Sequence, residues 1–99
     1  MTVTSVLELW FTPESLGDAE RVLAETLATT RAFAGNLGCD VTVDSEDPTH
    51  YAVFERWESI EADDAYRAFR ATPEGTSALG PLLASRALTR YADLWSVDG

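Results

Sequence analysis

The sequence predicts an α+β fold, with a four-stranded antiparallel sheet and helices on one face of it. Three observations lead to this prediction. Apolar residues recur at spacings of three and four between residues 16 and 33, which is the period of a helix. Apolar and polar residues alternate between residues 37 and 43, which is the period of a strand. Strand and helix patterns then follow one another in the order β-α-β-β-α-β.

The first strand and the first helix account for the first third of the chain. Residues 3–11, VTSVLELWF, are rich in β-branched and aromatic types and predict a strand. Thr12-Pro13-Glu14 follows, with a capping residue, a proline suited to a first turn and an acid that complements the helix dipole. The helical stripe runs to about Phe33, and Gly35-Asn36 indicates its end.

A β-hairpin is predicted next. Residues 37–43 alternate as a half-buried strand, and residues 45–49, SEDPT, have the composition of a turn. Residues 50–57, HYAVFERW, predict the following strand. Because the connection is short, the two strands are expected to pair antiparallel.

A second helix is predicted after Ser59, which can cap it. One apolar face is expected to comprise Ala62, Ala65, Tyr66 and Phe69. The acids in its first turns are expected to serve the cap and a solvated face; they are Glu61, Asp63 and Asp64.

The last part of the chain predicts a short third helix and a final strand. Thr72-Pro73-Glu74 repeats the capping pattern seen before the first helix, and Gly80-Pro81 interrupts the third helix. Residues 86–95, RALTRYADLW, predict the last strand. The resulting order is that of a ferredoxin-like domain, and residues 1–99 are expected to form a single domain.

Large apolar residues are expected on both faces of this sheet. Leu7 and Leu9 point one way along the first strand, and Val6 and Trp10 point the other way. Helices on one face leave the other apolar face uncovered, and such a face usually marks an interface. We therefore expect a homodimer with its sheets packed face to face.

Charge and cysteine content exclude several functions. The net charge is -10, from seven arginines, no lysine and seventeen acids, so nucleic acids and anionic membranes are not expected partners. The absence of lysine excludes Schiff-base chemistry through a lysine and a Walker-type phosphate site. One histidine and one cysteine cannot form an ordinary zinc site, so no metal is expected. With a single Cys39 and no signal-peptide pattern, the expected location is cytoplasmic.

The central segment resembles a known family. Thr30-Arg31-Ala32 followed by Gly35 resembles a T-R-A-x-x-G motif at the end of the first helix, and residues 51–59, YAVFERWES, resemble a block with an aromatic residue, Val, Glu, Trp and Ser. Ala65-Tyr66 follows at the matching spacing. On these motifs the chain resembles the antibiotic biosynthesis monooxygenase family of the dimeric α+β barrel group.

The resemblance implies a fold, a partner and an activity. It implies a dimeric α+β barrel that needs no cofactor and uses molecular oxygen to oxidise a phenolic, anthrone-type or quinol-type aromatic small molecule. Val53 stands where the anthrone-oxidising branch typically has Asn, four residues before Trp57, and Tyr66 stands where His is often found. The haem-degrading branch needs a His after the second helix, whereas the one histidine here is His50. The resemblance therefore does not extend to haem degradation.

Six residues are the candidates for the site. Trp57 and Tyr66 are expected to be catalytic, because an indole N–H can donate to a substrate oxygen and a phenol can exchange a proton with one. The expected substrate-binding residues are Trp10, Phe69, Arg31 and Arg86. Each also has a purely structural interpretation as core packing, a helix-end charge or an ion pair.

Some polar residues are expected to have structural roles. Arg86 and Arg90 share one face of the last strand and are expected to pair with Glu8 or Glu55 or to reach a ligand. Cys39 is expected to be a small buried hydrophobe, and His50, beside a turn, is expected to be a solvated surface residue.

Three functions remain open from the sequence. The first is the cofactor-independent monooxygenase, with the substrate between the sheet and the second helix. The second is an isomerase or cyclase of a small carbonyl compound in the same pocket, which oxygen uptake would distinguish from the first. The third is a non-catalytic dimeric ligand-binding domain. A fold alone does not choose among them.

Overall fold

The computed structural model describes residues 1–97, and its elements follow the predicted order. The strands and helices are β1 (Val3–Phe11), α1 (Leu16–Ala32), β2 (Asn36–Asp44), β3 (Asp47–Trp57), α2 (Ile60–Arg70) and β4 (Leu83–Ala92). Three short 3-10 turns occur at Pro13–Ser15, Pro73–Gly75 and Gly80–Leu82. Within residues 1–97, no helix combines the length and apolar character needed to cross a membrane.

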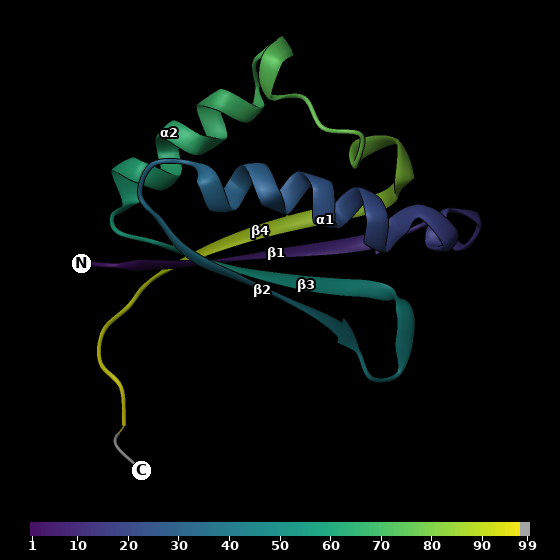
Figure 1. Cartoon of the computed structure of the whole chain (residues 1–99). Helices are drawn as coiled ribbons and strands as arrows, with labels where there is room; N and C mark the ends of the chain where they lie inside the picture. Colours follow the sequence, from purple (N-terminus) through teal and green to yellow (C-terminus); the bar gives the residue numbers. More distant parts are fainter. Residues whose placement is uncertain (98–99) are drawn as a thin grey trace.

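The four strands form one antiparallel sheet in the order β2-β3-β1-β4. Both helices lie on the same face of this sheet (Figure 1). This confirms the predicted ferredoxin-like α+β fold. Because β1 pairs with both β3 and β4, it lies inside the sheet, and β2 and β4 are the edge strands.

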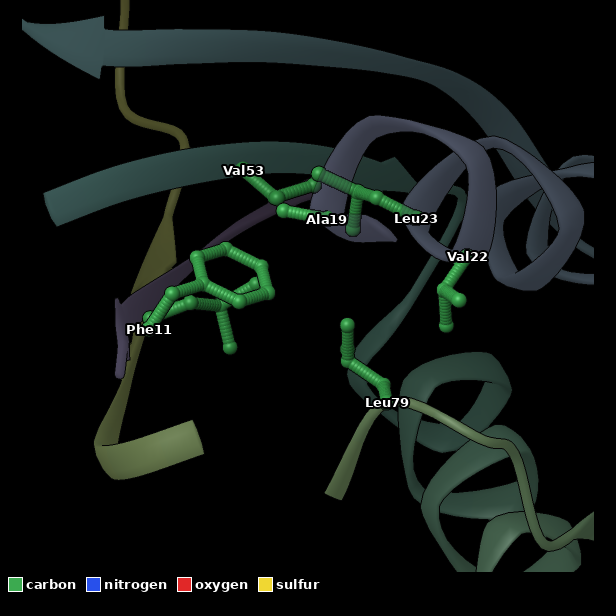
Figure 2. Packing of buried hydrophobic residues seen from close by; sticks show 7 residues of the cluster. Phe11, Ala19, Val22, Leu23, Val53 and Leu79 are labelled. Carbon is green, nitrogen blue, oxygen red and sulfur yellow. The ribbon is translucent and has the colours of Figure 1, made fainter. Parts of the chain in front are cut away.

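The apolar core lies between the sheet and α1. Side chains from β1, β3, α1 and the segment before β4 converge there (Figure 2). The buried members are Leu9, Phe11, Ala19, Val22, Leu23, Val53 and Leu79. A second buried group, next to α2, contains Val3, Trp57 and Tyr66. The alternation predicted for β1 is confirmed, because Leu9 is fully buried and Val6 and Trp10 are partly exposed on the opposite face.

The connection between β2 and β3 is shorter than predicted. The predicted turn 45–49 is wrong in extent, because β2 ends at Asp44 and β3 begins at Asp47. Pro48 therefore lies within β3. The pairing of β3 with β1 stops at His50, so the missing N–H of Pro48 interrupts no hydrogen bond to β1.

The prediction for residues 72–95 also needs correction. Instead of a third helix, two separate 3-10 turns form; Thr72 caps the first, its Oγ1 accepting a hydrogen bond from Gly75 N at 3.2 Å. The last strand is Leu83–Ala92 rather than 86–95. The reason is the length of β1: Phe11 pairs with Leu83 and Val3 with Ala92, so residues beyond Ala92 have no strand to pair with.

One residue predicted for the apolar face of α2 does not belong to it. Ala65 is exposed, whereas Tyr66 is buried and Ala62 and Phe69 pack against it. Asp63 takes a buried position instead. The buried face of α2 is therefore partly polar, and this is where the candidate site lies.

We call the sheet face opposite the helices the outer face. Among its members on β3, Phe54 is 38% exposed, and on β4 Tyr91 is 55% exposed. Its residues, read from the strand register, are Thr4, Val6, Glu8, Trp10, Gly38, Asp40, Thr42, His50, Ala52, Phe54, Arg56, Ser85, Ala87, Thr89 and Tyr91.

Candidate active site

Four residues from four strands form one row across the helix-facing side of the sheet. Glu55 on β3 pairs in register with Cys39 on β2 and Ser5 on β1, and Ser5 pairs with Arg90 on β4. Residues opposite one another in register project from the same face, so all four side chains point toward the helices. Ser5 and Glu55 are buried. A polar row inside the molecule needs partners from the layer above it.

Helix α2 supplies those partners from positions one turn apart. Ser59 caps the helix, its Oγ accepting a hydrogen bond from Ala62 N at 3.1 Å, as predicted. A spacing of four then places Asp63 beside Arg67, with 2.9 Å between Arg67 Nε and Asp63 Oδ1. Arg67 also reaches Glu55, with 2.5 Å between its Nη2 and Oε1 of Glu55.

Ser5, Glu55, Asp63, Arg67 and Arg90 form what we call the acid–arginine cluster. The Ser5 hydroxyl donates to Oδ2 of Asp63 at 2.7 Å, and Nη1 of Arg90 lies 3.5 Å from the same oxygen. The two carboxylates are 1% and 0% exposed, but the side chains of Arg67 and Arg90 are 25% and 34% exposed. The arginines therefore separate the carboxylates from solvent, and an entering molecule would meet them first.

Hydrogen-bonding capacity is left over inside this cluster. Oδ1 of Asp63 and Nε of Arg67 are both buried, and neither makes a hydrogen bond, because their close contact lacks hydrogen-bond geometry. Buried polar atoms are nearly always hydrogen-bonded, so exceptions are candidates for a functional role. The two atoms instead face each other as an ion pair at 2.9 Å.

The sequence-based expectations missed this cluster. The prediction of a solvated face for Asp63 is wrong, because Asp63 is fully buried. Arg90 pairs with Asp63 and Asp64 rather than with Glu8 or Glu55. The sequence does contain a signal that Glu55 is buried. Glu55 lies two residues from Val53 and two from Trp57, and both of these are on the core side of β3. A glutamate on a core-facing position must have a partner.

Three predicted site residues lie together beside this cluster. Trp57, Tyr66 and Phe69 pack with Phe33 as an aromatic cluster, with ring centroids 4.9 Å apart for Trp57 and Tyr66 and 5.4 Å apart for Phe33 and Phe69. Trp57 is 0% and Tyr66 2% exposed. The spacing of two on β3 puts Trp57 next to Glu55, and its Nε1 donates to Glu55 Oε1 at 3.3 Å.

The Tyr66 hydroxyl is also held inside the protein. Arg70, one turn later on α2, donates from Nε to the phenol oxygen at 2.7 Å. The hydroxyl of Thr30, on α1, lies 2.5 Å from the same oxygen. Arg70 extends further to the carbonyl oxygens of Thr26 and Gly75. Tyr66 therefore links α1 to α2, and its contact with a substrate would require a change in this packing.

The other three predicted site residues lie elsewhere. Trp10 is on the outer face, so it does not line the same space as Trp57. Arg31 is exposed at the end of α1 and donates to the carbonyl oxygen of Asn36 at 3.2 Å. Arg86 is exposed on β4, opposite Leu9 and therefore on the helix-facing side.

The structure also places Cys39 and His50, for which the sequence predicts structural roles. Cys39 is only half-buried, and burial, followed by the charge of Glu55, raises the pKa of its thiol. His50 lies at the surface near the turn as predicted, but it is only partly solvated. Its ring stacks on Trp10 and contacts Asp44 and Glu8, and its side chain is 20% exposed.

Two cavities lie on the outer face. The larger, of about 470 Å³, is lined by Thr2, Thr4, Arg56 and Asp93 together with residues 94–96. The smaller, of about 220 Å³, shares Thr4 and Arg56 and adds Gly38, Asp40 and Phe54. Within residues 1–97, no three His, Cys, Asp or Glu side chains gather in a metal-binding arrangement.

The acid–arginine cluster has the residue types needed for proton abstraction and for holding an anion. A buried carboxylate can accept a proton, and guanidinium groups can stabilise an oxyanion. Aromatic side chains next to such groups are typical of sites that bind small organic molecules.

Most of the chain matches the model of a known protein family. The family model described as antibiotic biosynthesis monooxygenase matches residues 2–80. A search of curated proteins gave no match.

Solved structures share the fold at low sequence identity. Rv0793 from Mycobacterium tuberculosis is 22% identical, with a TM-score of 0.79 over 99% of this chain and 100% of that one. A candidate antibiotic biosynthesis monooxygenase from Deinococcus radiodurans is 24% identical, with a TM-score of 0.81 over 97% and 96% of the two chains. A mutant of SnoaB, a cofactor-independent oxygenase from Streptomyces nogalater, is 18% identical, with a TM-score of 0.81 over 99% and 98%. At these identities the similarity establishes the shared fold.

Proposed function

Because the chain belongs to the antibiotic biosynthesis monooxygenase family, we propose that it is a cofactor-independent monooxygenase. Its substrate is a phenolic, anthrone-type or quinol-type aromatic small molecule, and molecular oxygen is the co-substrate. The observation that carries the proposal is the buried acid–arginine cluster beside the aromatic cluster. The cofactor-independent oxygenase with the same fold supports it.

In the proposed reaction the protein's main task is to remove a proton from the substrate, and no cofactor takes part. Ground-state oxygen reacts readily with electron-rich carbanions and phenolates, so the protein has to remove a proton and hold the resulting anion. In an anthrone, a CH₂ group and O₂ become a carbonyl group and water. The substrate supplies all four electrons, one oxygen atom enters the carbonyl and the other leaves as water. No external reductant is required.

Glu55 is the proton acceptor in this proposal. Its carboxylate is buried, and Trp57 Nε1 and Arg67 Nη2 both donate to its Oε1. Arg67 and Arg90, the partly exposed members of the cluster, bind the substrate oxygen as it becomes negative. The role of Trp57 is to position Glu55.

Tyr66 and Phe69 complete the proposed site from α2. Tyr66 positions Arg70 and joins α2 to α1 through Thr30, which keeps the wall of the site in place. Phe69 supplies an aromatic surface next to it. Arg86 lies four residues before Arg90 on the same face of β4 and adds positive charge at the edge of the site.

Oxygen uptake tests the proposal. Metal-stripped protein is mixed with a panel of anthrones and hydroquinones, and oxygen consumption is measured after correction for autoxidation. Saturable uptake is expected. Glu55→Gln should lower kcat by about 100-fold, because a positioned base contributes roughly that much. Trp57→Phe and Tyr66→Phe should each lower kcat about tenfold, since they act by positioning.

A variant with the same chemical change elsewhere in the molecule controls for effects on activity that do not come from the cluster. Glu20→Gln on the exposed side of α1 makes the same chemical change as Glu55→Gln away from the cluster, and it should retain full kcat. Full activity in Glu55→Gln would show that the site is wrongly placed. Absence of uptake, combined with proton exchange at the substrate carbon, would favour an isomerase or cyclase instead.

The proposed active form is a homodimer whose outer faces pack together. Partly exposed apolar side chains on that face support this, as do Leu94 and Trp95, which are 79% and 76% exposed. The chain after β4 leaves the sheet on the side away from the helices (Figure 1), where the second copy would lie.

A further inference from the structure

Both nitrogens of the His50 ring contact carboxylates. Nδ1 lies 2.9 Å from Oδ2 of Asp44, and Nε2 lies 3.0 Å from Oε1 of Glu8. An ionised carboxylate can only accept hydrogen bonds, so both nitrogens must carry a proton for both contacts to be hydrogen bonds. The geometry therefore fits the imidazolium ion and disfavours the neutral ring, in which one nitrogen lone pair would face a carboxylate.

The remaining neighbours of His50 also favour a positive charge. Its ring lies parallel to that of Trp10, with centroids 4.4 Å apart and an angle of 3° between the planes, and the face of an indole attracts cations. Asp47 on β3 adds negative charge nearby. The residues of β4 in register with Trp10 and Glu8 are Ser85 and Ala87, which do not titrate.

These contacts set the direction of the titration. The hydrogen bond to Asp44 raises the pKa of His50, burial opposes this, and Glu8 raises it further. A group whose pKa is raised on folding stabilises the folded arrangement fully below its ordinary pKa of about 6.5. That contribution is lost as the pH rises through the raised value. The His50 contacts therefore weaken as the pH rises through a value above the ordinary pKa of the ring.

We propose that the outer face is a proton-controlled pairing surface for a second copy of this chain, with His50 as the proton sensor. The protonated ring joins β1 to the end of β2 through Glu8 and Asp44 and balances their charges. The neutral ring leaves both carboxylates without a cation. The inference rests on the homodimer proposed above.

The charges on the outer face explain why proton binding by His50 and pairing of two copies are coupled. The outer face holds the carboxylates of Glu8 and Asp40 and the guanidinium of Arg56, and Asp44 at the end of β2 contacts His50. The whole chain carries a net charge of -10. Packing two such faces together brings like charges close, and each proton held by His50 reduces that repulsion. Proton binding and pairing must then favour each other.

Proton NMR of the single histidine tests the sensor. The Cε1 proton of His50 is followed against pH in the wild type, where we expect a pKa above the ordinary value. Glu8→Gln and Asp44→Asn should each lower that pKa by about half a unit or more. Glu20→Gln, which removes the same charge on the helix side of the molecule, should leave it unchanged. Titration of His50 at its ordinary pKa would overturn the sensor, as would equal effects of Glu8→Gln and Glu20→Gln.

Sedimentation equilibrium at about pH 6 and about pH 9 tests the pairing. If His50 gains half a pKa unit on pairing in each of two copies, the dissociation constant rises about tenfold over this range. His50→Gln should remove most of that dependence. A dimer whose affinity is the same at both pH values overturns the role of His50 as a proton sensor and leaves the pairing surface standing. A chain that stays monomeric at both values overturns the pairing surface together with the homodimer, and leaves the monooxygenase to the oxygen measurements.

Discussion

At the residue scale, the unusual feature is a pair of fully buried carboxylates. Moving Glu55 and Asp63 out of water costs several kcal/mol each, and this is offset only by good contacts with cations and donors. Arg67 contacts both carboxylates, while Ser5 and Arg90 contact Asp63. A purely apolar arrangement of similar volume is often as stable as a buried ion pair, so stability alone does not explain the cluster.

Removing one charge from the cluster should be costly. Asp63→Asn leaves the positive charges of Arg67 and Arg90 less compensated in a buried environment, and the free energy of unfolding should fall by about 3 kcal/mol. Urea denaturation measures this. Asp64→Asn is the matched control, since Asp64 also contacts Arg90 but is 59% exposed, and its cost should stay below about 1 kcal/mol. Equal costs for the two variants would contradict the buried-cluster interpretation.

At the element scale, β1 determines much of the architecture. It pairs with β3 on one side and with β4 over nearly its whole length on the other. Its helix-facing positions supply Leu9 and Phe11 to the apolar core and Ser5 to the acid–arginine cluster. One strand therefore holds both the core and the candidate site in register.

The turn between α1 and β2 depends on Gly35. Its φ of +89° is in the left-handed region, and a Cβ at this position would lie 2.6 Å from Cβ of Ala62 on α2. Both the backbone conformation and the close approach of α2 require glycine.

Gly35→Ala should lower the free energy of unfolding by about 2 kcal/mol or more, because the strain and the clash add. Thermal and urea denaturation measure it. Gly17→Ala offers the contrast: a Cβ at Gly17 meets nothing within 4 Å, and the residue lies in α1. That variant should be neutral or more stable by up to about 1 kcal/mol. If Gly35→Ala is as stable as Gly17→Ala, the turn does not need glycine.

At the scale of the whole molecule, the two faces of the sheet differ. The helix-facing side holds the core and the candidate site, and the outer face has partly exposed apolar residues and the His50 contacts. The exposed segment after β4 adds further apolar surface on the outer side. A second copy packed there would cover this surface.

Phe54→Asp should convert the proposed dimer to monomers, because it buries a charge at the centre of the pairing surface. Sedimentation equilibrium gives the mass, and circular dichroism checks that the fold is kept. Leu88→Asp is the control: Leu88 is 41% exposed, close to the 38% of Phe54, but its register partner Leu7 places it on the helix-facing side. Dissociation by both variants, or by neither, would argue against pairing through the outer face.

Much of the fold can be predicted from the sequence because its signals are local. The order of elements, the bounds of β1, the Ser59 cap and the alternation of β1 depend on period and on turn chemistry within a few residues. The same holds for the end of α1, which Gly35 indicates. Family membership can also be predicted from short motifs, because residues 30–35 and 51–59 lie in the matched range 2–80.

Features that depend on contacts between distant segments could not be predicted from the sequence. The length of β1 determines where β4 ends. Pro48 can lie within β3 because β1 stops pairing with β3 at His50. Asp63 is buried because Ser5, 58 residues away, and Arg90 meet it beneath α2. His50 is held by Glu8, 42 residues away. Local patterns show which face of an element is polar, but only packing shows whether that polar face meets solvent or another charge.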